Sequence, residues 1–201
     1  MLDKYLNQVT CIDCLEAMRE LPDKCVDLVL TDPPYGIGIS GNPFRQKHQK
    51  SNWDEQIPED DVFKEIFRIS KEQIIWGGNF FDLPKSQGFL IWDKVQPEKF
   101  SSSMCEYAWM SFQSPAKLFK GHVVTIEKNK IHPTQKPIRL FEWILRKYSE
   151  EGQLICDPFI GSGTTAIAAQ NLNRNFIGFE KDEEYCKIAQ DRTNYIRKGL
   201  F

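Results

Sequence analysis

The sequence predicts an α/β fold built on a doubly wound, mostly parallel sheet with an antiparallel strand. Two observations predict it. Short apolar runs alternate with segments of helical periodicity along the 201 residues, as strands and crossover helices do in such folds. Two of the apolar runs also end in turns that carry polar groups, at 31–35 and 157–165, and open α/β sheets bind ligands at strand ends of this kind. The chain length suits one domain with a core large enough to fold alone.

The first half of the chain is predicted to contain three strands and two helices. The second helix places Val62, Phe63 and Ile66 on one face, and the run at 26–31 is apolar enough for a buried parallel strand. The segment at 36–52 is rich in glycine, serine, asparagine and basic residues, so we expect a mobile loop beside the site. The expected strands are 8–12, 26–31 and 73–76, and the expected helices are 13–21 and 60–70.

The second half continues the same alternation. Its first helix has Leu140, Phe141 and Ile144 on one apolar face, whereas the interval 93–131 shows no clear alternation of strands and helices. The expected strands are 89–92, 107–112, 153–156 and 175–179, the first two antiparallel, and the expected helices are 137–148, one that begins at Thr164, and 182–197.

The turn after the strand at 26–31 has the sequence Thr31-Asp32-Pro33-Pro34-Tyr35. Because both prolines fix φ and lack an N–H, the turn is stiff and its carbonyl groups meet no local donors. Asp32 and these carbonyls form a row of acceptors, and Tyr35 offers a flat face on which a planar group can stack. This chemistry suits an exocyclic amine. The candidate catalytic residues are therefore Asp32, Pro33, Pro34 and Tyr35.

The second turn, DPFIGSGTT at 157–165, follows a short apolar strand and leads into a helix. Gly161 and Gly163 let the backbone approach a ligand closely, as glycines do in nucleotide-binding turns at helix N-termini. The turn is not a Walker loop, since no Gly-Lys-Thr occurs in it. Glu180 ends the next strand about 20 residues further on, where such folds place the acid that binds a ribose.

These motifs resemble those of S-adenosylmethionine-dependent DNA amino-methyltransferases of the permuted beta group. In that family the DPPY motif precedes the FxGxG cofactor motif, and the phrase HPTQKP, here at 132–137, comes shortly before the latter. The resemblance covers residues from about 9 to 192. It implies a Rossmann-like, circularly permuted class I methyltransferase fold, with a short target-recognition insertion at about 93–131 in a single domain of residues 1–201.

The resemblance also implies roles for individual residues. The glycine turn would wrap the methionine part of the cofactor, with Thr134 and Lys136 at its carboxylate end. Glu180 would bind the ribose hydroxyls, and Asp13 would reach the adenine amine. Asp13 and Glu180 also suit plain helix caps, which leaves both interpretations open. The candidate cofactor-binding residues are Asp13, Asp32, Thr134, Lys136, Asp157, Phe159, Gly161, Ser162, Gly163, Thr164 and Glu180.

The chemistry of methyl transfer explains why these residue types occur together. The amino group of adenine or cytosine is a poor nucleophile, because its lone pair is delocalised into the ring. A carboxylate and a fixed carbonyl that accept its two hydrogens favour a tetrahedral nitrogen, and Asp32 and Pro33 suit those roles. The base has to leave the duplex to reach such a pocket, and Tyr35 is the expected stacking platform.

The net charge of −2 gives no global signature of a nucleic-acid binder, so contacts to double-stranded DNA are expected to be local. Two stretches are basic, around residue 47 and between 114 and 139. Ordinary solvated lysines explain either stretch equally well. The candidate DNA-binding residues are Arg45, Lys47, Lys117, Lys120, Lys128 and Lys130.

The cysteines predict a reducing compartment and no metal site. No signal peptide or long apolar span is recognisable, so we expect a cytoplasmic protein with reduced thiols and no membrane partner. Cys11 and Cys14 have zinc-like spacing, but no second pair completes a site. The sequence leaves a homodimer and a cognate restriction enzyme open.

The leading functional prediction is methylation of the 6-amino group of adenine in DNA. It rests on the resemblance, because most adenine-specific members of that family have Asp at the first position of the DPPY motif, as this chain does. Methylation of the 4-amino group of cytosine is the alternative within the class. RNA and protein glutamine methyltransferases usually have Asn at that position and the cofactor turn first. A DNA-binding module without catalysis would require a damaged site, and neither turn is damaged.

Overall fold

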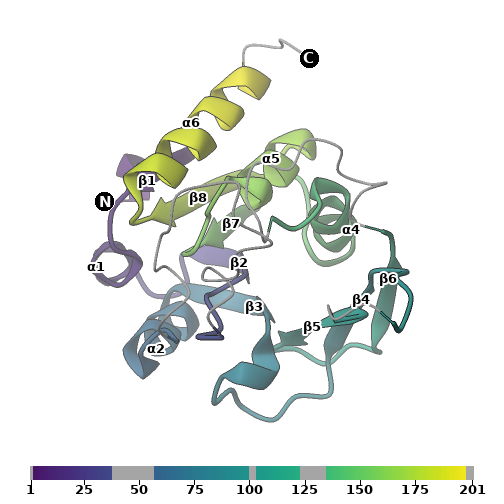
Figure 1. Ribbon diagram of the computed structural model, residues 1–201. Helices are drawn as coiled ribbons and strands as arrows, with labels where there is room; N and C mark the ends of the chain where they lie inside the picture. Colours follow the sequence, from purple (N-terminus) through teal and green to yellow (C-terminus); the bar gives the residue numbers. More distant parts are fainter. Residues whose placement is uncertain (1, 38–56, 100–102, 123–134, 198–201) are drawn as a thin grey trace.

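The computed structural model describes residues 2–37, 57–99, 103–122 and 135–197. Over these residues eight strands form one sheet in the order β1-β8-β7-β2-β3-β5-β4-β6 (Figure 1). The strands are β1 (Gln8–Cys11), β2 (Val26–Thr31), β3 (Ser70–Trp76), β4 (Phe89–Asp93), β5 (Cys105–Met110), β6 (Lys117–Lys120), β7 (Leu154–Asp157) and β8 (Asn175–Glu180). The α-helices are α1 (Cys14–Arg19), α2 (Asp60–Ile69), α4 (Ile138–Tyr148), α5 (Thr164–Asn171) and α6 (Glu183–Arg197).

The pairing of the strands confirms the predicted fold class. The run from β1 through β8, β7 and β2 to β3 is parallel, and β5 is antiparallel to both β3 and β4. The edge strand β6 runs parallel to β4 and was not predicted. Its four residues alternate poorly and three of them are exposed, so periodicity gave no signal there.

Helices cover both faces of the sheet, and each face has its own apolar core (Figure 1). One core joins the sheet to α1 and α2 through Met18 and Ile66, which are fully buried. The other joins it to α4, α5 and α6 and contains Trp76, Phe141 and Ala189. Helix α5 packs against both α4 and α6, and six of its eight residues are buried, two of them the threonines of its first turn.

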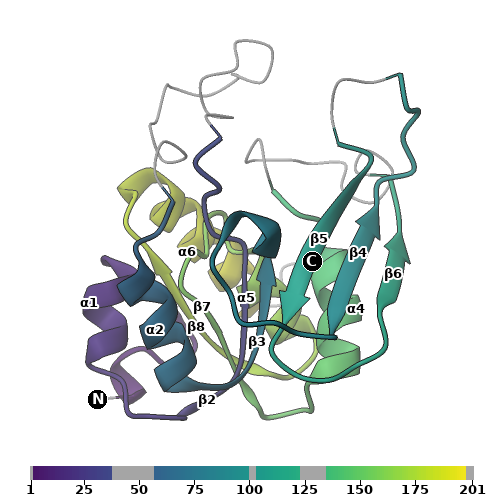
Figure 2. The same ribbon diagram turned by 90° about the horizontal axis from the view of Figure 1, so that it is seen from below.

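The direction of the strands decides where the functional turns meet. Because β2, β3, β4, β6, β7 and β8 all run the same way, their carboxyl ends lie at one edge of the sheet, and the connection from β4 to β5 projects from that edge (Figure 2). The two motif turns follow β2 and β7, so the fold brings them together. The loop predicted at 36–52 lies largely outside the described residues.

The helices are short for a bilayer. In the part of the chain that the structure describes, none combines the length and apolar character that crossing a membrane requires.

Candidate functional site

A cavity of about 380 Å³ opens where the carboxyl ends of β2, β7 and β8 meet. Its lining includes Asp13 and Glu180, which follow β1 and end β8, and Asp32 and Pro34, which follow β2. The start of α2 closes one side, with Ile57 and its neighbours. Both motif turns therefore line a single cavity.

The glycine turn at 161–163 takes its shape from left-handed backbone. Gly161 and Gly163 have φ of +50° and +87°, a region that costs other residues about 1 kcal/mol or more. A Cβ on Gly163 would lie 3.1 Å from Cβ of Ala189, so the glycine also lets α5 pack closely on α6. Arg192 of α6 donates to Oγ of Ser162 at 3.1 Å and so supports the turn.

Two acids lie at the end of the cavity nearest β1 and β8. The carboxylate of Glu180 accepts the backbone N–H groups of Gly161 at 3.0 Å and Asp182 at 2.9 Å, and burial raises its pKa. Asp13 caps α1 by accepting the N–H groups of Leu15 and Glu16 at 2.8 and 3.3 Å. Asp13 is thus a helix cap, as one of the two interpretations proposed, and it also lines the cavity.

Asp157 joins β7 to β2 at the wall of the cavity. Its side chain is buried and accepts the hydroxyl groups of Thr31, at 2.7 Å, and Thr165, at 2.5 Å, and the N–H of Phe159 at 3.0 Å. Burial raises the pKa of Asp157 to about 6, although these three donors favour the charged form.

The raised pKa of Asp157 predicts a loss of stability as the pH rises. The folded protein holds the carboxyl proton more tightly than the unfolded chain does, so this group stabilises the fold below about pH 4 and ceases to do so as the pH passes about 6. The effect is on the order of 3 kcal/mol. Urea unfolding at two pH values, about 4.5 and 7.5, should show Asp157→Asn gaining stability relative to the unsubstituted protein at the higher pH. An unchanged difference between the two pH values would contradict this.

The catalytic candidates after β2 form a compact cluster. The hydroxyl of Tyr35 donates to Oδ1 of Asp32 at 2.6 Å, and its ring stacks on Phe80 with centroids 4.9 Å apart and planes 13° apart. Phe80 is 39% exposed. The planar face that the sequence predicts at Tyr35 is therefore part of an aromatic pair, because one side of the ring already contacts Phe80.

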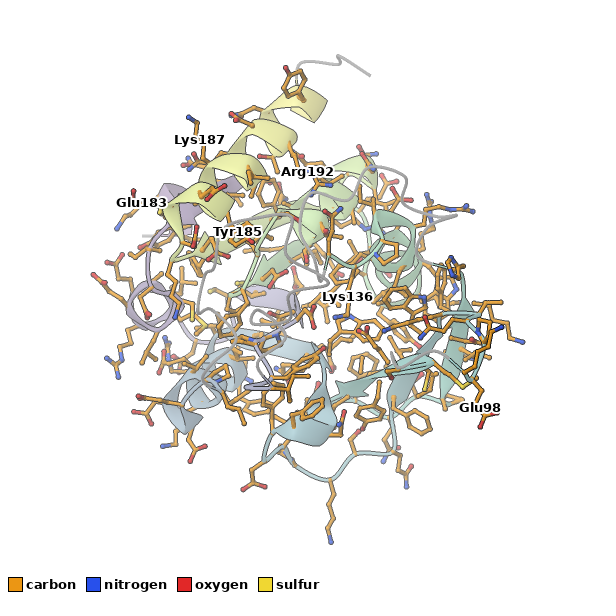
Figure 3. The ribbon with its side chains drawn as sticks, viewed as in Figure 1. Glu98, Lys136, Glu183, Tyr185, Lys187 and Arg192 are labelled. Atoms are coloured by element: carbon orange, nitrogen blue, oxygen red, sulfur yellow. The ribbon has the colours of Figure 1, made fainter. Side chains whose placement is uncertain are left out.

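A lysine holds the other oxygen of Asp32. The ammonium of Lys136, whose side chain is only 4% exposed, forms an ion pair with Oδ2 of Asp32, contacts Oε2 of Glu106 at 3.1 Å and donates to the hydroxyl of Tyr35 at 3.3 Å. Lys94 pairs with the second oxygen of Glu106 at 2.5 Å. Lys136 lies in the interior of the molecule, whereas Glu98 lies at the periphery (Figure 3).

The cluster separates its two carboxyl groups electrostatically. Burial raises the pKa of Asp32, and the nearby charge of Glu106 adds to the effect of burial. Burial also acts to raise the pKa of Glu106, but the ammonium groups of Lys136 and Lys94 outweigh it and lower that pKa to about 2. Burial acts to lower the pKa of Lys136, and the charges of Asp32 and Glu106 instead hold it well above its ordinary value. Glu106 therefore stays ionised, and Asp32 is the carboxyl group of the two that takes up a proton more readily.

Gly77, which follows β3, controls the position of the Tyr35 ring. A Cβ at Gly77 would lie 2.2 Å from Cε1 of Tyr35, and its φ is +68°. We expect Gly77→Ala to lower the free energy of unfolding by about 2–4 kcal/mol, through backbone strain and this overlap. Gly152→Ala is the matched control, because Gly152 has φ of +82° and no atom within 4 Å of its Cβ position. Urea unfolding of both variants separates the effect of the overlap with Tyr35 from that of backbone strain. Equal losses of unfolding free energy in the two variants would contradict an effect of the overlap.

The structure brings most of the predicted catalytic and cofactor-binding residues to the cavity wall. Pro33 is buried in the turn, and Gly163 is the N-cap of α5. Lys117 and Lys120 lie on the edge strand β6. The residues that line the cavity are Asp13, Asp32, Pro34, Lys136, Asp157, Phe159, Gly161, Ser162, Thr164 and Glu180. The predicted residues outside the described ranges are Thr134, Arg45, Lys47, Lys128 and Lys130.

Sequence reasoning missed three contributors to the site. Glu106 and Lys94 pair across neighbouring strands, and Phe80 follows β3. Glu106 lies near the start of β5, one residue before the strand expected at 107–112, and no pattern indicated its partner.

Comparison with known proteins identifies the family. The model of the N6/N4 methylase family, described as DNA methylase, matches residues 75–191. YubD of Escherichia coli (strain K12), which is assigned as a methylase, is 26% identical over 210 residues, with coverage of 94% of this chain and 90% of YubD. The type II methyltransferase M.HinfI of Haemophilus influenzae is 25% identical over 253 residues, with coverage of 98% and 70%.

Solved structures share the fold at low identity. The complex of M1.HpyAVI with SAM has a TM-score of 0.62 and 23% identity, covering 93% of this chain and 98% of that one. TTHA0409 of Thermus thermophilus, complexed with S-adenosyl-L-methionine, has a TM-score of 0.60 and 24% identity, with coverage of 92% and 94%. The cytosine-N4-specific PvuII methyltransferase has a TM-score of 0.59 and 16% identity, with coverage of 96% and 91%. Because the family model matches more than half of its length, the chain belongs to the N4/N6 family of DNA amino-methyltransferases.

Proposed function

We propose that this DNA amino-methyltransferase methylates the 6-amino group of adenine in a base rotated out of double-stranded DNA. The observation that carries the proposal is the place of Asp32. Its carboxylate lines the cavity together with the glycine turn and Glu180. The same cavity is therefore lined by an acceptor for an amine and by a turn of the nucleotide-binding kind. The choice of adenine rests on the aspartate of the DPPY motif.

The cofactor is S-adenosylmethionine, and the residues at the glycine turn suit it. The turn is free of side chains at Gly161 and Gly163, and the half-buried carboxylate of Glu180 stands at the end of β8. We assign the ribose hydroxyls to Glu180, the adenine amine to Asp13, and the methionine part to the turn at 159–164. Bound there, the cofactor supplies an electrophilic methyl group on its sulfonium.

Asp32 and the carbonyl of Pro33 would accept the two hydrogens of the target amine. These acceptors are fixed before the base arrives, since Tyr35 and Lys136 already hold the carboxylate. Preorganised acceptors stabilise the charge that develops on nitrogen and align a transfer between two bound molecules. No covalent intermediate with the protein is required. The aromatic pair of Tyr35 and Phe80 would bound the base and offset part of its unstacking.

DNA would approach the edge of the sheet that carries the two turns. The exposed Lys117 and Lys120 lie on β6, whose carboxyl end is at this edge, and the β4–β5 connection projects from it (Figure 2). The interval predicted for target recognition, 93–131, includes both features. We propose that it contacts the duplex locally, in keeping with the net charge of −2.

Analysis of modified nucleosides tests the proposal. The chain is expressed in a bacterial host that lacks its own DNA methyltransferases, and the DNA is digested to nucleosides for mass spectrometry. We expect N6-methyladenine, and none in cells that express Asp32→Ala at the same level. Detection of N4-methylcytosine without N6-methyladenine would show that the target is cytosine and not adenine. The companion assay measures transfer of label from S-adenosylmethionine to unmethylated DNA by the purified protein. If neither the cells nor the purified protein produced methylated DNA, the proposed function would be refuted.

A further inference from the structure

Four charged side chains form a continuous chain of ion pairs that reaches the cavity at Lys136 and Asp32. The chain runs from Lys94 to Glu106, then to Lys136, and ends at Asp32. None of the four side chains is more than 23% exposed. The proposed transfer uses Asp32, and neither Glu106 nor Lys94 has a part in it. Charges that are largely removed from water destabilise a fold unless they are well paired, so we looked for a role for Glu106 and Lys94.

The hydrogen bonds of Lys136 show what Glu106 does. An ammonium has three donors, and those of Lys136 have three acceptors around them: Asp32, Glu106 and the hydroxyl of Tyr35. Asp32 and Glu106 attract it from two elements, the turn after β2 and the strand β5. The ammonium is therefore held by both carboxylates, and its contact with Asp32 is the shorter of the two.

Lys94 completes the charge balance. Without it, two carboxylates would share one ammonium, and one of them would be driven toward protonation. With it, Glu106 stays ionised, and Asp32 shares the ammonium of Lys136 with Glu106. Lys94 and Glu106 also flank the β4–β5 connection, so the chain of ion pairs links the base of that connection to the catalytic turn.

We propose that Glu106 is a positioning residue for methyl transfer, which holds the ammonium of Lys136 in register with Asp32 and Tyr35, while Lys94 anchors Glu106. This role rests on the proposed function. Sharing Lys136 leaves Asp32 a stronger acceptor for the amine than a carboxylate with an undivided ion pair would be. Glu106 acts through Lys136 and touches neither substrate nor cofactor in this scheme.

Glu106→Gln separates this role from simple packing. Loss of the Glu106 charge leaves the ammonium of Lys136 paired with Asp32 alone, so kcat should fall roughly 10–100-fold, as for other outer partners of a reacting group, with KM for DNA nearly unchanged. The acid limb of the kcat profile should move to lower pH, because the charge of Glu106 raises the pKa of Asp32. The other groups that face Asp32, namely Lys136, Tyr35 and Asp157, stay in place.

Two further variants make the test decisive. Glu106→Asp keeps the charge with a shorter reach, so its acid limb should stay at the original pH while kcat falls. Glu72→Gln is the matched control, since Glu72 is exposed on the neighbouring strand β3 and should leave both quantities unchanged. All rates are taken per folded molecule, counted by binding of labelled S-adenosylmethionine.

The outcomes distinguish the inference from the function. An unshifted acid limb and full kcat in folded Glu106→Gln would overturn the positioning role while methyl transfer by the unsubstituted chain stands. A fall in kcat that the binding count fully explains would show that Glu106 only stabilises the fold. Absence of transfer by the unsubstituted chain would refute the proposed function itself, and the role of Glu106 with it.

Discussion

Lys136→Met should destabilise the protein by about 3–5 kcal/mol near neutral pH and abolish methyl transfer. The methionine has a similar volume, so packing is nearly preserved and the lost charge decides the result. Without the ammonium, the buried carboxylates of Asp32 and Glu106 lack the cation that they share. Lys94 then compensates only Glu106. An uncompensated buried charge is among the few single changes that destabilise a fold this strongly.

The pH dependence of Lys136→Met gives a sharper test. In the variant the pKa values of Asp32 and Glu106 rise in the folded state, so protonation restores stability, which is lost again as the pH increases through the new values. Urea unfolding should therefore show a large deficit at about pH 7.5 that narrows toward about pH 4. Lys71→Met is the control, because its ion pair with Asp27 is 59% exposed on the lysine side and contributes little. Equal stabilities of the two variants at the higher pH would refute the account.

The sequence predicted the fold well where hydrophobic periodicity was long. Strand β2 and helix α2 lie within one residue of their expected bounds, because apolar runs and an amphipathic face determine them locally. Strand β6 was missed, since its place depends on pairing with β4 and its own side chains are mostly exposed. An edge strand of this kind is specified by its neighbour more than by its residues.

The candidate site divides in the same way. Asp32, Tyr35 and the glycine turn stand in contiguous motifs, and the structure places the turns at one cavity. Lys136 was predicted to face the carboxylate end of the cofactor, whereas the structure places its ammonium on Asp32. Its partner Glu106 comes from a distant strand, and no local pattern encodes that contact. Which residues of different strands become partners depends on the fold, and a single sequence does not show it.

Asp32→Ala should retain cofactor binding and lose methyl transfer by about 10²–10³-fold. The glycine turn is bonded to Glu180, whereas Asp32 is bonded to Tyr35 and Lys136, so we expect the proposed cofactor end to keep its shape. The fold should survive, because Lys136 keeps its contact with Glu106. Rates of label transfer to DNA, with S-adenosylmethionine binding measured in parallel, check the prediction. Asp61→Ala is the control, since Asp61 is 53% exposed on α2 and pairs only at the surface.

Asp32→Asn then separates the charge of Asp32 from its geometry. The amide keeps one oxygen acceptor in place, but it removes the anion that attracts Lys136, so the ammonium is drawn toward Glu106. If an acceptor alone suffices, the asparagine variant should recover much of the rate that the alanine variant loses. If the charge shared through Lys136 is required, both variants should be equally slow. Full activity in the alanine variant would exclude Asp32 from the reaction, and with it the assignment of the turn after β2 as the catalytic one.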